Sequence, residues 1–353
     1  MTMELTDNLN IRQFKSLVTP DQIKQVFPES DQAAHVIARS RRQIEDILIG
    51  RDRRRMVITG PCSLHDEEAT LDYARRLHDL QQKFADQVLL VMRAYFEKPR
   101  TTLGWKGMLY DPHLDGSYDI ENGLRLSRKL LLEIAEIGLP TATEFLDPIV
   151  PQYLADLVSW AAIGARTTES QIHRQMASGL SMPIGFKNAT DGNLGVSIDA
   201  IKSAQSPHSF LGIDRNGQVI IAETKGNRYG HLVMRGGTDG PNYSSEYVAF
   251  AEVLLRKAHI PTGIVIDCSH ANSHKNHKRQ REALFDIADQ IRSGNRSIAG
   301  VMLESFINEG KQSIGAAGVL KYGTSLTDAC IGWSETEELI NYLVKAVAEG
   351  LFE

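Results

Sequence analysis

The feature of this sequence that most limits its fold is the alternation of short apolar runs with longer amphipathic stretches. Eight runs rich in β-branched residues are typical of strands, at 56–61, 88–94, 141–145, 162–166, 184–188, 231–236, 263–269 and 298–304. A helical pattern follows each run, at about 67–83, 122–138, 151–158, 171–179, 193–204, 245–258, 278–292 and 335–349. This repeat predicts an α/β fold, a closed (β/α)8 TIM barrel. A doubly wound open sheet stays the alternative, because periodicity alone does not show whether a sheet closes.

Two segments do not fit the repeat, and they set the predicted domain boundaries. Residues 1–50 precede the first predicted strand. Residues 209–224 hold two apolar runs around DRNG, which is typical of an inserted β-hairpin. We therefore predict an N-terminal extension at 1–50 and a barrel at 51–353 that carries the hairpin.

Composition excludes several classes of partner and location. The 353 residues contain no apolar run of membrane-spanning length, so we expect no membrane partner. The N-terminus MTMELTDNLN lacks the basic and apolar regions of a signal peptide, and an odd count of 3 cysteines is typical of a reducing cytoplasm. The net charge of −5 argues against nucleic acid as a partner.

A polar or reactive residue stands at or beside the C-terminal end of every predicted strand. In chain order these residues are Cys62, Arg93, Glu144, Arg166, Lys187, Arg235, His270 and Glu304. Barrel enzymes place their chemistry at these strand ends, because the loops that follow the strands converge there. Charged side chains are costly to bury inside apolar runs, so this placement predicts a functional site at one mouth of the barrel.

Half of these residues are cations, and they predict an anionic substrate. The strand-end cations are Arg93, Arg166, Lys187 and Arg235. Lys98 and Arg100 follow the second strand and would add two more charges. Guanidinium groups match phosphate and carboxylate oxygens, and this many cations predict two anionic small molecules or one with several anionic groups. For Lys98 and Arg100 taken alone, a solvated surface charge is an equally good interpretation.

Three of the remaining strand-end residues, joined by Asp328 beyond the last strand, predict a metal site. A thiol, an imidazole and carboxylates come together in Cys62, His270, Glu304 and Asp328. This donor set suits Mn, Fe, Co or Zn, and ligands that come singly from different strands favour a catalytic site over a structural one. Cys62 considered alone would more often be a small buried apolar residue. We interpret His65 as a loop histidine and Cys268 as a core residue.

Long motifs in this chain resemble one enzyme family. They are GPCS, MRAYFEKPRTTLGWKG, GARTTESQ, GFKN, RGG, DCSHAN and LTDACIGW. Across essentially the whole chain, the sequence resembles 3-deoxy-D-arabino-heptulosonate-7-phosphate (DAHP) synthase, and within it the class I-alpha enzymes regulated by aromatic amino acids. The resemblance implies a (β/α)8 barrel and a metal-dependent transferase of the shikimate pathway. Such an enzyme condenses phosphoenolpyruvate with erythrose 4-phosphate and releases phosphate.

The resemblance also implies roles for particular residues. The metal ligands would be Cys62, His270, Glu304 and Asp328, with one divalent ion per subunit, Mn2+ favoured and Fe2+, Co2+ or Zn2+ open. The phosphoenolpyruvate contacts would be Arg93, Lys98, Arg166, Lys187 and Arg235, beside Glu144 and the backbone of Ala165. The erythrose 4-phosphate loop would be Lys98, Pro99, Arg100 and Thr101. Lys98 and Glu144 are the candidates for proton transfer and for stabilising or orienting the reacting groups.

Regulation is a further implication of the resemblance. The inhibitor site would use Asp7, Asn8, Ile11, Gln152, Ser181, Phe210 and Ala222. The N-terminal arm would reach a neighbouring subunit in a homo-oligomer, a tetramer built from two dimers. Asn8 favours tyrosine as the inhibitor, because an amide donates a hydrogen bond to a phenolic oxygen. RRQIEDIL and YGHLVMRGG are similar to the tryptophan-sensitive type, so tryptophan or phenylalanine stays open, and a disordered terminus is the alternative for the arm.

Two other functions compete with this prediction. One is 3-deoxy-D-manno-octulosonate-8-phosphate synthase, against which the KPRT loop and the regulatory arm argue. The other is a catalytically inactive phosphate sensor on the same barrel, against which the full metal set argues.

Cys330 stands two residues past Asp328, and we also predict that oxidation joins it to Cys62.

Overall fold

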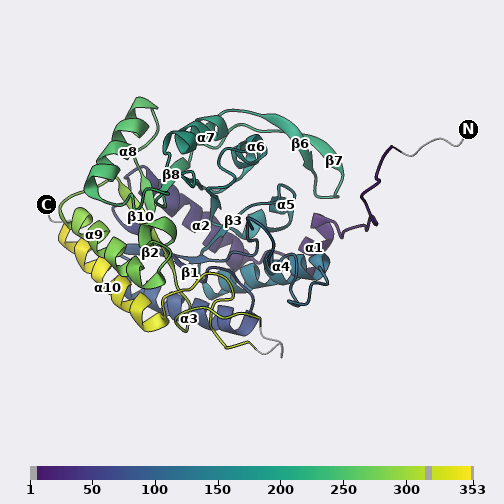
Figure 1. Cartoon of the computed structure of the whole chain (residues 1–353), viewed down its shortest axis with the longest axis horizontal. Coiled ribbons are helices and arrows are strands. Elements are labelled where there is room, and N and C mark those ends of the chain that lie inside the picture. The colour runs from purple at the N-terminus through teal and green to yellow at the C-terminus, as the bar shows by residue number, and fades with distance from the viewer. Residues whose placement is uncertain (1–5, 315–319, 351–353) are drawn as a thin grey trace, which may run out of the picture.

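The chain forms a closed barrel of parallel strands, as predicted. The computed structural model describes residues 6–314 and 320–350. The barrel order is β1-β10-β9-β8-β5-β4-β3-β2, and β1 also pairs with β2, so the sheet is closed and the open alternative is wrong (Figure 1). The barrel strands are β1 (Arg55–Gly60), β2 (Val88–Arg93), β3 (Thr141–Glu144), β4 (Trp160–Ile163), β5 (Ile184–Lys187), β8 (Gly230–Met234), β9 (Ile264–Asp267) and β10 (Ile298–Glu304).

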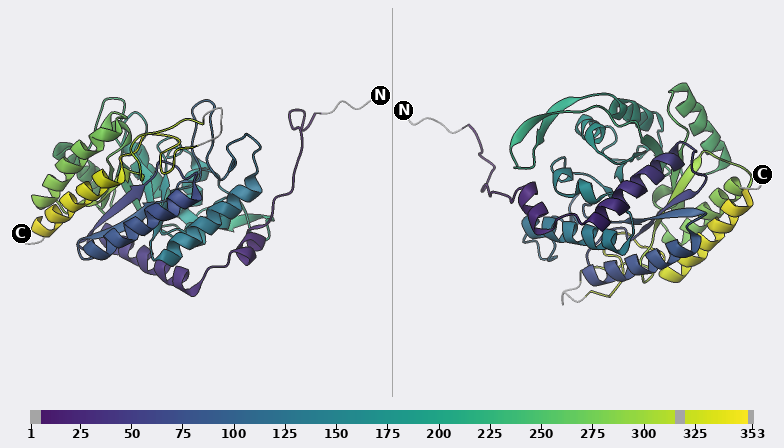
Figure 2. Two further views of the ribbon diagram at one scale, coloured as in Figure 1. Left: turned by 90° about the horizontal axis from the view of Figure 1, so that it is seen from below. Right: turned by 180° about the vertical axis from the view of Figure 1, so that it is seen from behind.

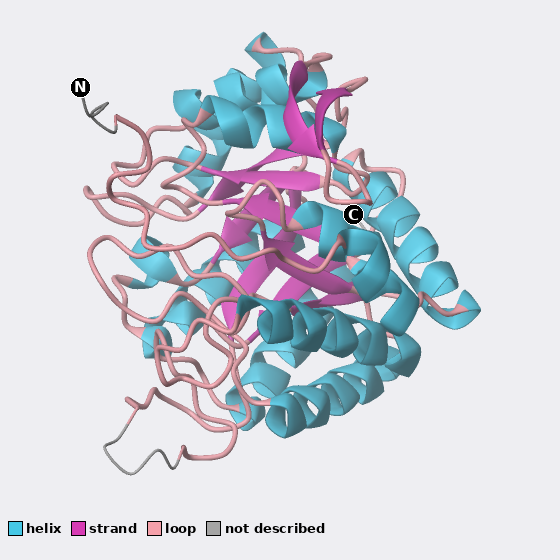
Figure 3. Cartoon of the chain, turned by 90° about the vertical axis from the view of Figure 1, so that its right-hand side faces the viewer, coloured by secondary structure: helices cyan, strands magenta, loops and turns pink. Residues whose placement is uncertain are grey.

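Helices surround the barrel (Figure 3). They are α1 (Pro20–Val26), α2 (Asp31–Leu48), α3 (Glu67–Phe84), α4 (Ile120–Ile137), α5 (Pro151–Leu154), α6 (Gln171–Gly179), α7 (Gly195–Gln205), α8 (Ser245–Lys257), α9 (Gln280–Arg292) and α10 (Trp333–Gly350). Short 3-10 turns complete them, at η1 (Ala155–Leu157), η2 (His270–Ser273) and η3 (His277–Arg279). Within the described part of the chain, no helix is long and apolar enough to cross a membrane.

Helix boundaries follow local capping chemistry. The side chain of Asp66 accepts a hydrogen bond from the backbone of Ala69 and begins α3, and Ser30 does the same for α2. Gly138 ends α4 in the left-handed conformation, at φ +97°. These signals explain why the predicted helix ranges lie within a few residues of the observed ones.

Helix α2 closes the end of the barrel at which the strands begin. Its residues Ile44, Ile47 and Leu48 belong to one buried cluster with the inward-facing strand residues Met56 and Trp160. The second helix of the predicted extension is therefore part of the inner core of the barrel. The 1–50 boundary itself stays a prediction.

A buried tryptophan–histidine pair lies in this inner core. Trp160 Nε1 donates a hydrogen bond to His231 Nε2 over 3.0 Å, and both residues are buried. His231 Nδ1 lies 3.0 Å from the carbonyl oxygen of Tyr229. Gly185 makes room for the indole, since a Cβ at this position would lie 2.4 Å from Trp160 Cζ2.

The predicted hairpin and the N-terminal arm lie at the periphery. β6 (Ser209–Ile213) and β7 (Val219–Glu223) form their own antiparallel sheet within 209–224. Residues 6–17 extend away from the barrel in both views of Figure 2. The backbone N–H of Asp21 donates to Arg215 O in the hairpin turn over 2.9 Å, so the arm leaves the body beside the hairpin.

Candidate active site

The strand ends carry a layer of polar side chains directly above an apolar layer. Side chains two residues apart on a strand point to the same side of the sheet. The inward-facing apolar residues Val91, Ala142, Val265 and Met302 are therefore followed by polar ones. These polar residues are Arg93, Glu144, Asp267 and Glu304. The long loops gather on one side of the barrel (Figure 3), and the polar layer forms the floor of a site there.

Three of the four predicted metal ligands lie together. Ligand atoms of Cys62, Glu304 and Asp328 all lie within 4.8 Å of one another. Cys62 Sγ is 3.7 Å from Asp328 Oδ2. Burial raises the pKa of the Cys62 thiol, and Glu304 adds to this effect. A metal bound here would require the thiol to release its proton.

His270 is the fourth predicted ligand, and it lies outside that group of three. β9 ends at Asp267, earlier than predicted, and His270 begins the η2 turn with φ +55°. Its Nδ1 is 2.9 Å from Asp267 Oδ2 and 2.7 Å from Ser269 Oγ. A carboxylate on one ring nitrogen leaves the other for a ligand, as in many metal-binding histidines.

Asp267 is a functional candidate that our sequence reasoning missed. It is fully buried and forms an ion pair with Lys187 Nζ at 2.9 Å, in addition to its contact with His270. Burial alone would raise the pKa of Asp267, but Lys187 and His270 hold it well below its usual range. The sequence signal that could have identified Asp267 is the presence of an acidic residue within the apolar strand pattern GIVIDCS.

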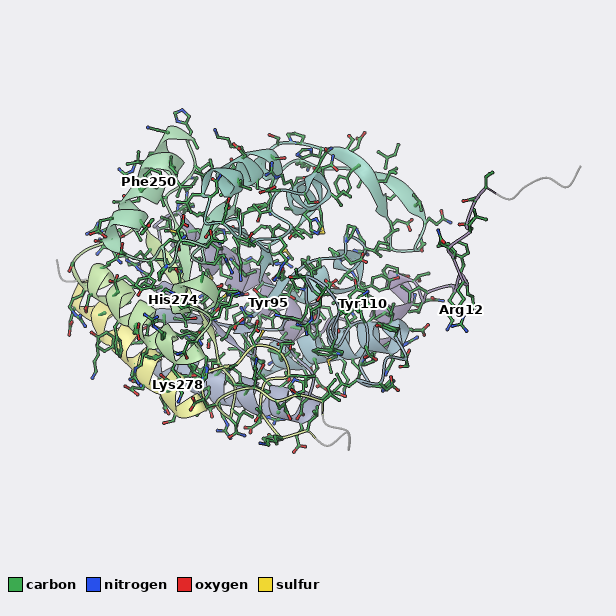
Figure 4. The ribbon with its side chains drawn as sticks, in the orientation of Figure 1. Arg12, Tyr95, Tyr110, Phe250, His274 and Lys278 are labelled. Atoms are coloured by element: carbon green, nitrogen blue, oxygen red, sulfur yellow. The ribbon has the colours of Figure 1, made fainter. Side chains whose placement is uncertain are left out.

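Lys98 lies beside the thiol. Its Nζ donates to Cys62 O over 3.0 Å and to Cys62 Sγ over 3.2 Å. Arg93 is fully buried, and its Nη2 lies 3.2 Å from Glu304 Oε1. Both cations face the ring of Tyr95, at 3.9 Å for Arg93 Cζ and 5.5 Å for Lys98 Nζ. Figure 4 places Tyr95 near the centre of the barrel. Our sequence reasoning did not identify Tyr95 as part of the site.

The other predicted cations differ in their exposure. Lys187 is buried, Arg235 is half-buried and Arg166 is exposed. Burial lowers the pKa of Arg235, and the nearby Arg166 lowers it further, whereas Asp267 acts in the opposite direction and raises it. Two guanidinium groups close enough to repel each other leave a position where an anion would be stabilised. Ala165 is half-buried next to Arg166.

The loop after β2 is only partly buried. Pro99 is half-buried, whereas Arg100 and Thr101 are exposed. Arg100 Nε donates to Trp105 O over 2.8 Å, so its guanidinium is held within its own loop. The preceding Glu97 is buried and accepts from the backbone N–H of Asp147 over 3.1 Å, and burial raises the pKa of Glu97 to about 8.

Glu144 is buried at the end of β3, and its position depends on Gly164, which directly follows the next strand, β4. A Cβ on Gly164 would lie 2.2 Å from Glu144 Oε1. The missing side chain at Gly164 is what allows Glu144 to point across the mouth of the barrel.

Cys268 is buried in the apolar core, as predicted. His65 lies in the loop between β1 and α3, as predicted, and is buried there against Phe306.

Cys330 lies close to Cys62, and both thiols are free. The backbone N–H of Cys62 points at Cys330 Sγ, 3.4 Å away. The predicted oxidative link between them stays a prediction.

The predicted inhibitor residues come from three parts of the chain. Gln152 and Ser181 line a cavity of about 440 Å³ between α2, α5 and the end of α6. Phe210 and Ala222 face each other in the hairpin register. Asp7, Asn8 and Ile11 are exposed on the arm. Figure 4 shows how far the arm residue Arg12 lies from the rest of the chain.

A closed (β/α)8 barrel with buried acids, a thiol and cations at its C-terminal strand ends defines an enzyme of the TIM-barrel class. A family model described as the DAHP synthetase I family matches residues 26–341. The chain belongs to this family.

Relatives with two different regulatory names are equally similar. The tryptophan-sensitive phospho-2-dehydro-3-deoxyheptonate aldolase of Escherichia coli K12 is 51% identical over 345 residues, covering 98% of this chain and 99% of the relative. The tyrosine-sensitive enzyme of the same strain is 52% identical over 341 residues, covering 96% of each. The solved aldolase of Francisella tularensis SCHU S4 is 48% identical with a TM-score of 0.95, covering 97% of this chain and 99% of that one. The resemblance to the family is confirmed, and the tyrosine-sensitive type is not singled out.

Proposed function

We propose that this enzyme condenses phosphoenolpyruvate with D-erythrose 4-phosphate to give DAHP and phosphate, with one divalent metal per subunit. The observation that carries the proposal is the grouping of Cys62, Glu304 and Asp328 within 4.8 Å, beside Lys98 and Arg93. A phosphate-sensing protein would need the cations but not this donor set. The names of the relatives support the same reaction.

The donor set fits a divalent transition metal. One thiol and two carboxylates converge, and His270 is oriented by Asp267 nearby. Mn2+ suits the carboxylates, and Fe2+, Co2+ or Zn2+ suits the thiol and imidazole. A metal held here would supply Lewis-acid activation of the aldehyde of erythrose 4-phosphate.

The cations would hold and orient the phosphorylated substrates. Phosphoenolpyruvate would lie among Arg93, Arg166, Lys187 and Arg235, beside Ala165. Erythrose 4-phosphate would lie against the loop Lys98, Pro99, Arg100 and Thr101. Arginine forks bind phosphate and carboxylate oxygens in a fixed orientation, which brings the methylene carbon of one substrate to the aldehyde carbon of the other.

The protein's acids and bases would then move protons. The methylene carbon attacks the aldehyde carbon, one C–C bond forms, and Lys98 donates a proton to the new alkoxide oxygen. Glu144 would stabilise the cationic carbon that results or orient the water that adds to it. The water that adds gives up one proton to the solvent. The phosphohemiketal then breaks its C–O bond to phosphate, which leaves with the bonding electron pair, while the hydroxyl loses its proton and becomes the ketone C=O.

The test is initial-rate phosphate release by chelated and metal-restored enzyme. We expect activity to disappear with chelation and to return with Mn2+. Lys98→Met should reduce kcat by about 100-fold or more if Lys98 is the proton donor. Lys106→Met, an exposed lysine of the same loop, is the matched control and should retain activity. Intact kcat in the Lys98 variant would exclude the donor role, and inactivity with every metal would favour the sensor.

We further propose feedback inhibition by an aromatic amino acid, with tyrosine favoured. Asp7 and Asn8 of an arm from a second subunit would meet Gln152, Ser181 and the hairpin. The cavity at Gln152 is lined by both signs of charge, including Lys24, Arg41 and Asp156, which suits a zwitterion. The enzyme would then be a cytoplasmic homotetramer built from two dimers. Adding each aromatic amino acid to the phosphate assay separates tyrosine from tryptophan and phenylalanine.

A further inference from the structure

A buried asparagine lies next to two of the cations of the proposed anion site. Asn188 follows Lys187 at the end of β5 and is fully buried. Its Oδ1 accepts a hydrogen bond from the backbone N–H of Arg235 over 2.8 Å. Its Nδ2 donates to Gly236 O and to Ala189 O, each over 2.9 Å. The side chain therefore ties β5 to the residue that carries one of the predicted substrate cations.

Two more buried asparagines extend this connection. Asn242 Oδ1 accepts from the backbone N–H of Gly236 over 2.8 Å, and Asn242 Nδ2 donates to Asn188 Oδ1 over 3.3 Å. The backbone N–H of Asn242 donates to Asn272 Oδ1 over 2.8 Å. Asn272 Nδ2 in turn donates to Asp267 O over 2.8 Å. We call Asn188, Asn242 and Asn272 the asparagine network, and it joins the ends of β5, β8 and β9.

The network begins where the backbone ladder stops. The pairing of β5 with β8 ends at Lys187 and Val233, and Asn188 adds one last backbone hydrogen bond to Val233 O at 3.0 Å. Beyond this point the backbone N–H groups of Arg235 and Gly236 bond to asparagine side chains instead. Gly236 has φ +75°, and a Cβ there would lie 2.8 Å from Ala271 C, so its backbone packs directly against η2.

Arg235 depends on this backbone support. Within the described residues its guanidinium makes one hydrogen bond, from Nη1 to Gly236 O at 3.4 Å, and no ion pair. A long cationic side chain without a fixed partner is oriented mainly by where its Cα is held. The asparagine network holds that Cα with neutral groups, so it leaves the positive charge of Arg235 available to an anion.

We propose that Asn188, supported by Asn242 and Asn272, is a positioning residue that sets Arg235 for the anionic substrate. This inference rests on the proposed function, in which Arg235 contacts phosphoenolpyruvate. Removing the amide would leave the backbone N–H of Arg235 without its hydrogen-bond acceptor and would loosen the loop that follows Arg235. Phosphoenolpyruvate binding should weaken, whereas the erythrose 4-phosphate loop follows another strand and should be unaffected. Because Asn272 also bonds to Asp267, which orients His270, the test is made at saturating metal.

The chain offers a matched control for the test. Asn227 is also buried, and its Nδ2 donates to Leu180 O at 3.0 Å and to Met182 O at 2.8 Å, while its Oδ1 accepts from Tyr229 N at 3.0 Å. Asn227 thus makes the same kind of hydrogen bonds as Asn188. It lies near the N-terminal ends of β5 and β8, away from the proposed site. A purely structural role for Asn188 would give the two variants the same kinetic behaviour.

The experiment compares steady-state kinetics of Asn188→Ala, Asn227→Ala and Arg235→Ala in the Mn2+-loaded enzyme. For Asn188→Ala we expect the KM for phosphoenolpyruvate to rise at least about tenfold. At saturating Mn2+ we expect its kcat and its KM for erythrose 4-phosphate to change less than about twofold. Asn227→Ala should lose stability to urea without the rise in KM. Asn242→Ala is the second test of the network and should show the same rise if Asn188→Ala does not fold.

Two results would overturn the inference, and they are distinguishable. If Arg235→Ala raises the KM for phosphoenolpyruvate but Asn188→Ala and Asn242→Ala behave like Asn227→Ala, the network has only a structural role. If Arg235→Ala itself leaves that KM unchanged, the proposed contact of Arg235 with phosphoenolpyruvate fails, and the inference fails with it.

Discussion

Replacing His231 with glutamine should remove about 2 kcal/mol of the stability that this fold loses between pH 7 and pH 5. His231 is buried, and its Nε2 accepts the hydrogen bond of the Trp160 indole. Burial lowers the pKa of His231 to about 4, and its contact with the Tyr229 carbonyl offsets this only in part. In the folded protein the ring therefore stays neutral under conditions in which an unfolded histidine takes up a proton.

The sign and size of the effect follow from proton linkage. The unfolded state binds a proton below about pH 6.5, and the folded state does so only near pH 4, so the free energy of unfolding falls as the pH drops between these values. A difference of about 2.5 pKa units corresponds to about 3 kcal/mol in full. Between pH 7 and pH 5 the loss is about 2 kcal/mol. Glutamine keeps an acceptor for the indole but does not titrate.

The assay is urea unfolding at pH 7 and pH 5, followed by tryptophan fluorescence at one protein concentration. We expect His231→Gln to lose about 2 kcal/mol less than the parent over this range. His35→Gln, at an exposed position of α2, is the matched control and should lose as much as the parent. Equal losses in the parent and in His231→Gln would refute the reasoning.

Two further substitutions and one deletion test the site and its regulation. Gly164→Ala should push Glu144 from its position and lower kcat at least about tenfold, with Mn2+ binding unchanged; an unchanged kcat would argue against a role for Glu144. Asp267→Asn should weaken Mn2+ binding by roughly 10- to 100-fold through His270, as measured by direct titration of the metal-free protein; unchanged affinity would exclude His270 as an oriented ligand. Deleting residues 1–17 should abolish inhibition by aromatic amino acids and keep catalysis, as shown by phosphate release; inhibition that persists would contradict the role of the arm.

Sequence periodicity predicted the barrel well, because both faces of a parallel strand are buried and its pattern is strong. The predicted hairpin and helices have clear turn and capping signals of their own. The role of α2 was not predictable in the same way. Ile44, Ile47 and Leu48 form an ordinary apolar helix face, and only the folded chain shows that this face covers the end of the barrel.

Site residues could be predicted where side-chain direction follows strand alternation. Arg93, Glu144 and Glu304 stand at such positions and do lie in the polar layer. His270 lies beyond the end of β9, where the η2 turn changes the direction of the chain, so alternation did not apply to it. Asn188 was missed because an uncharged amide beside a strand end has no distinctive pattern, and its importance comes from the loops that meet it.

The hairpin of β6 and β7 pairs only within itself among the described residues, and the barrel register passes directly from β5 to β8. A change in its sequence or length therefore cannot slip any barrel strand relative to its neighbours. Evolution can rewrite this insertion without altering the alignment of the residues on the barrel floor. For protein engineering, the hairpin is a place where sequence and length can be varied while the barrel sequence is kept, and under the proposed regulation such changes would alter the response to the inhibitor.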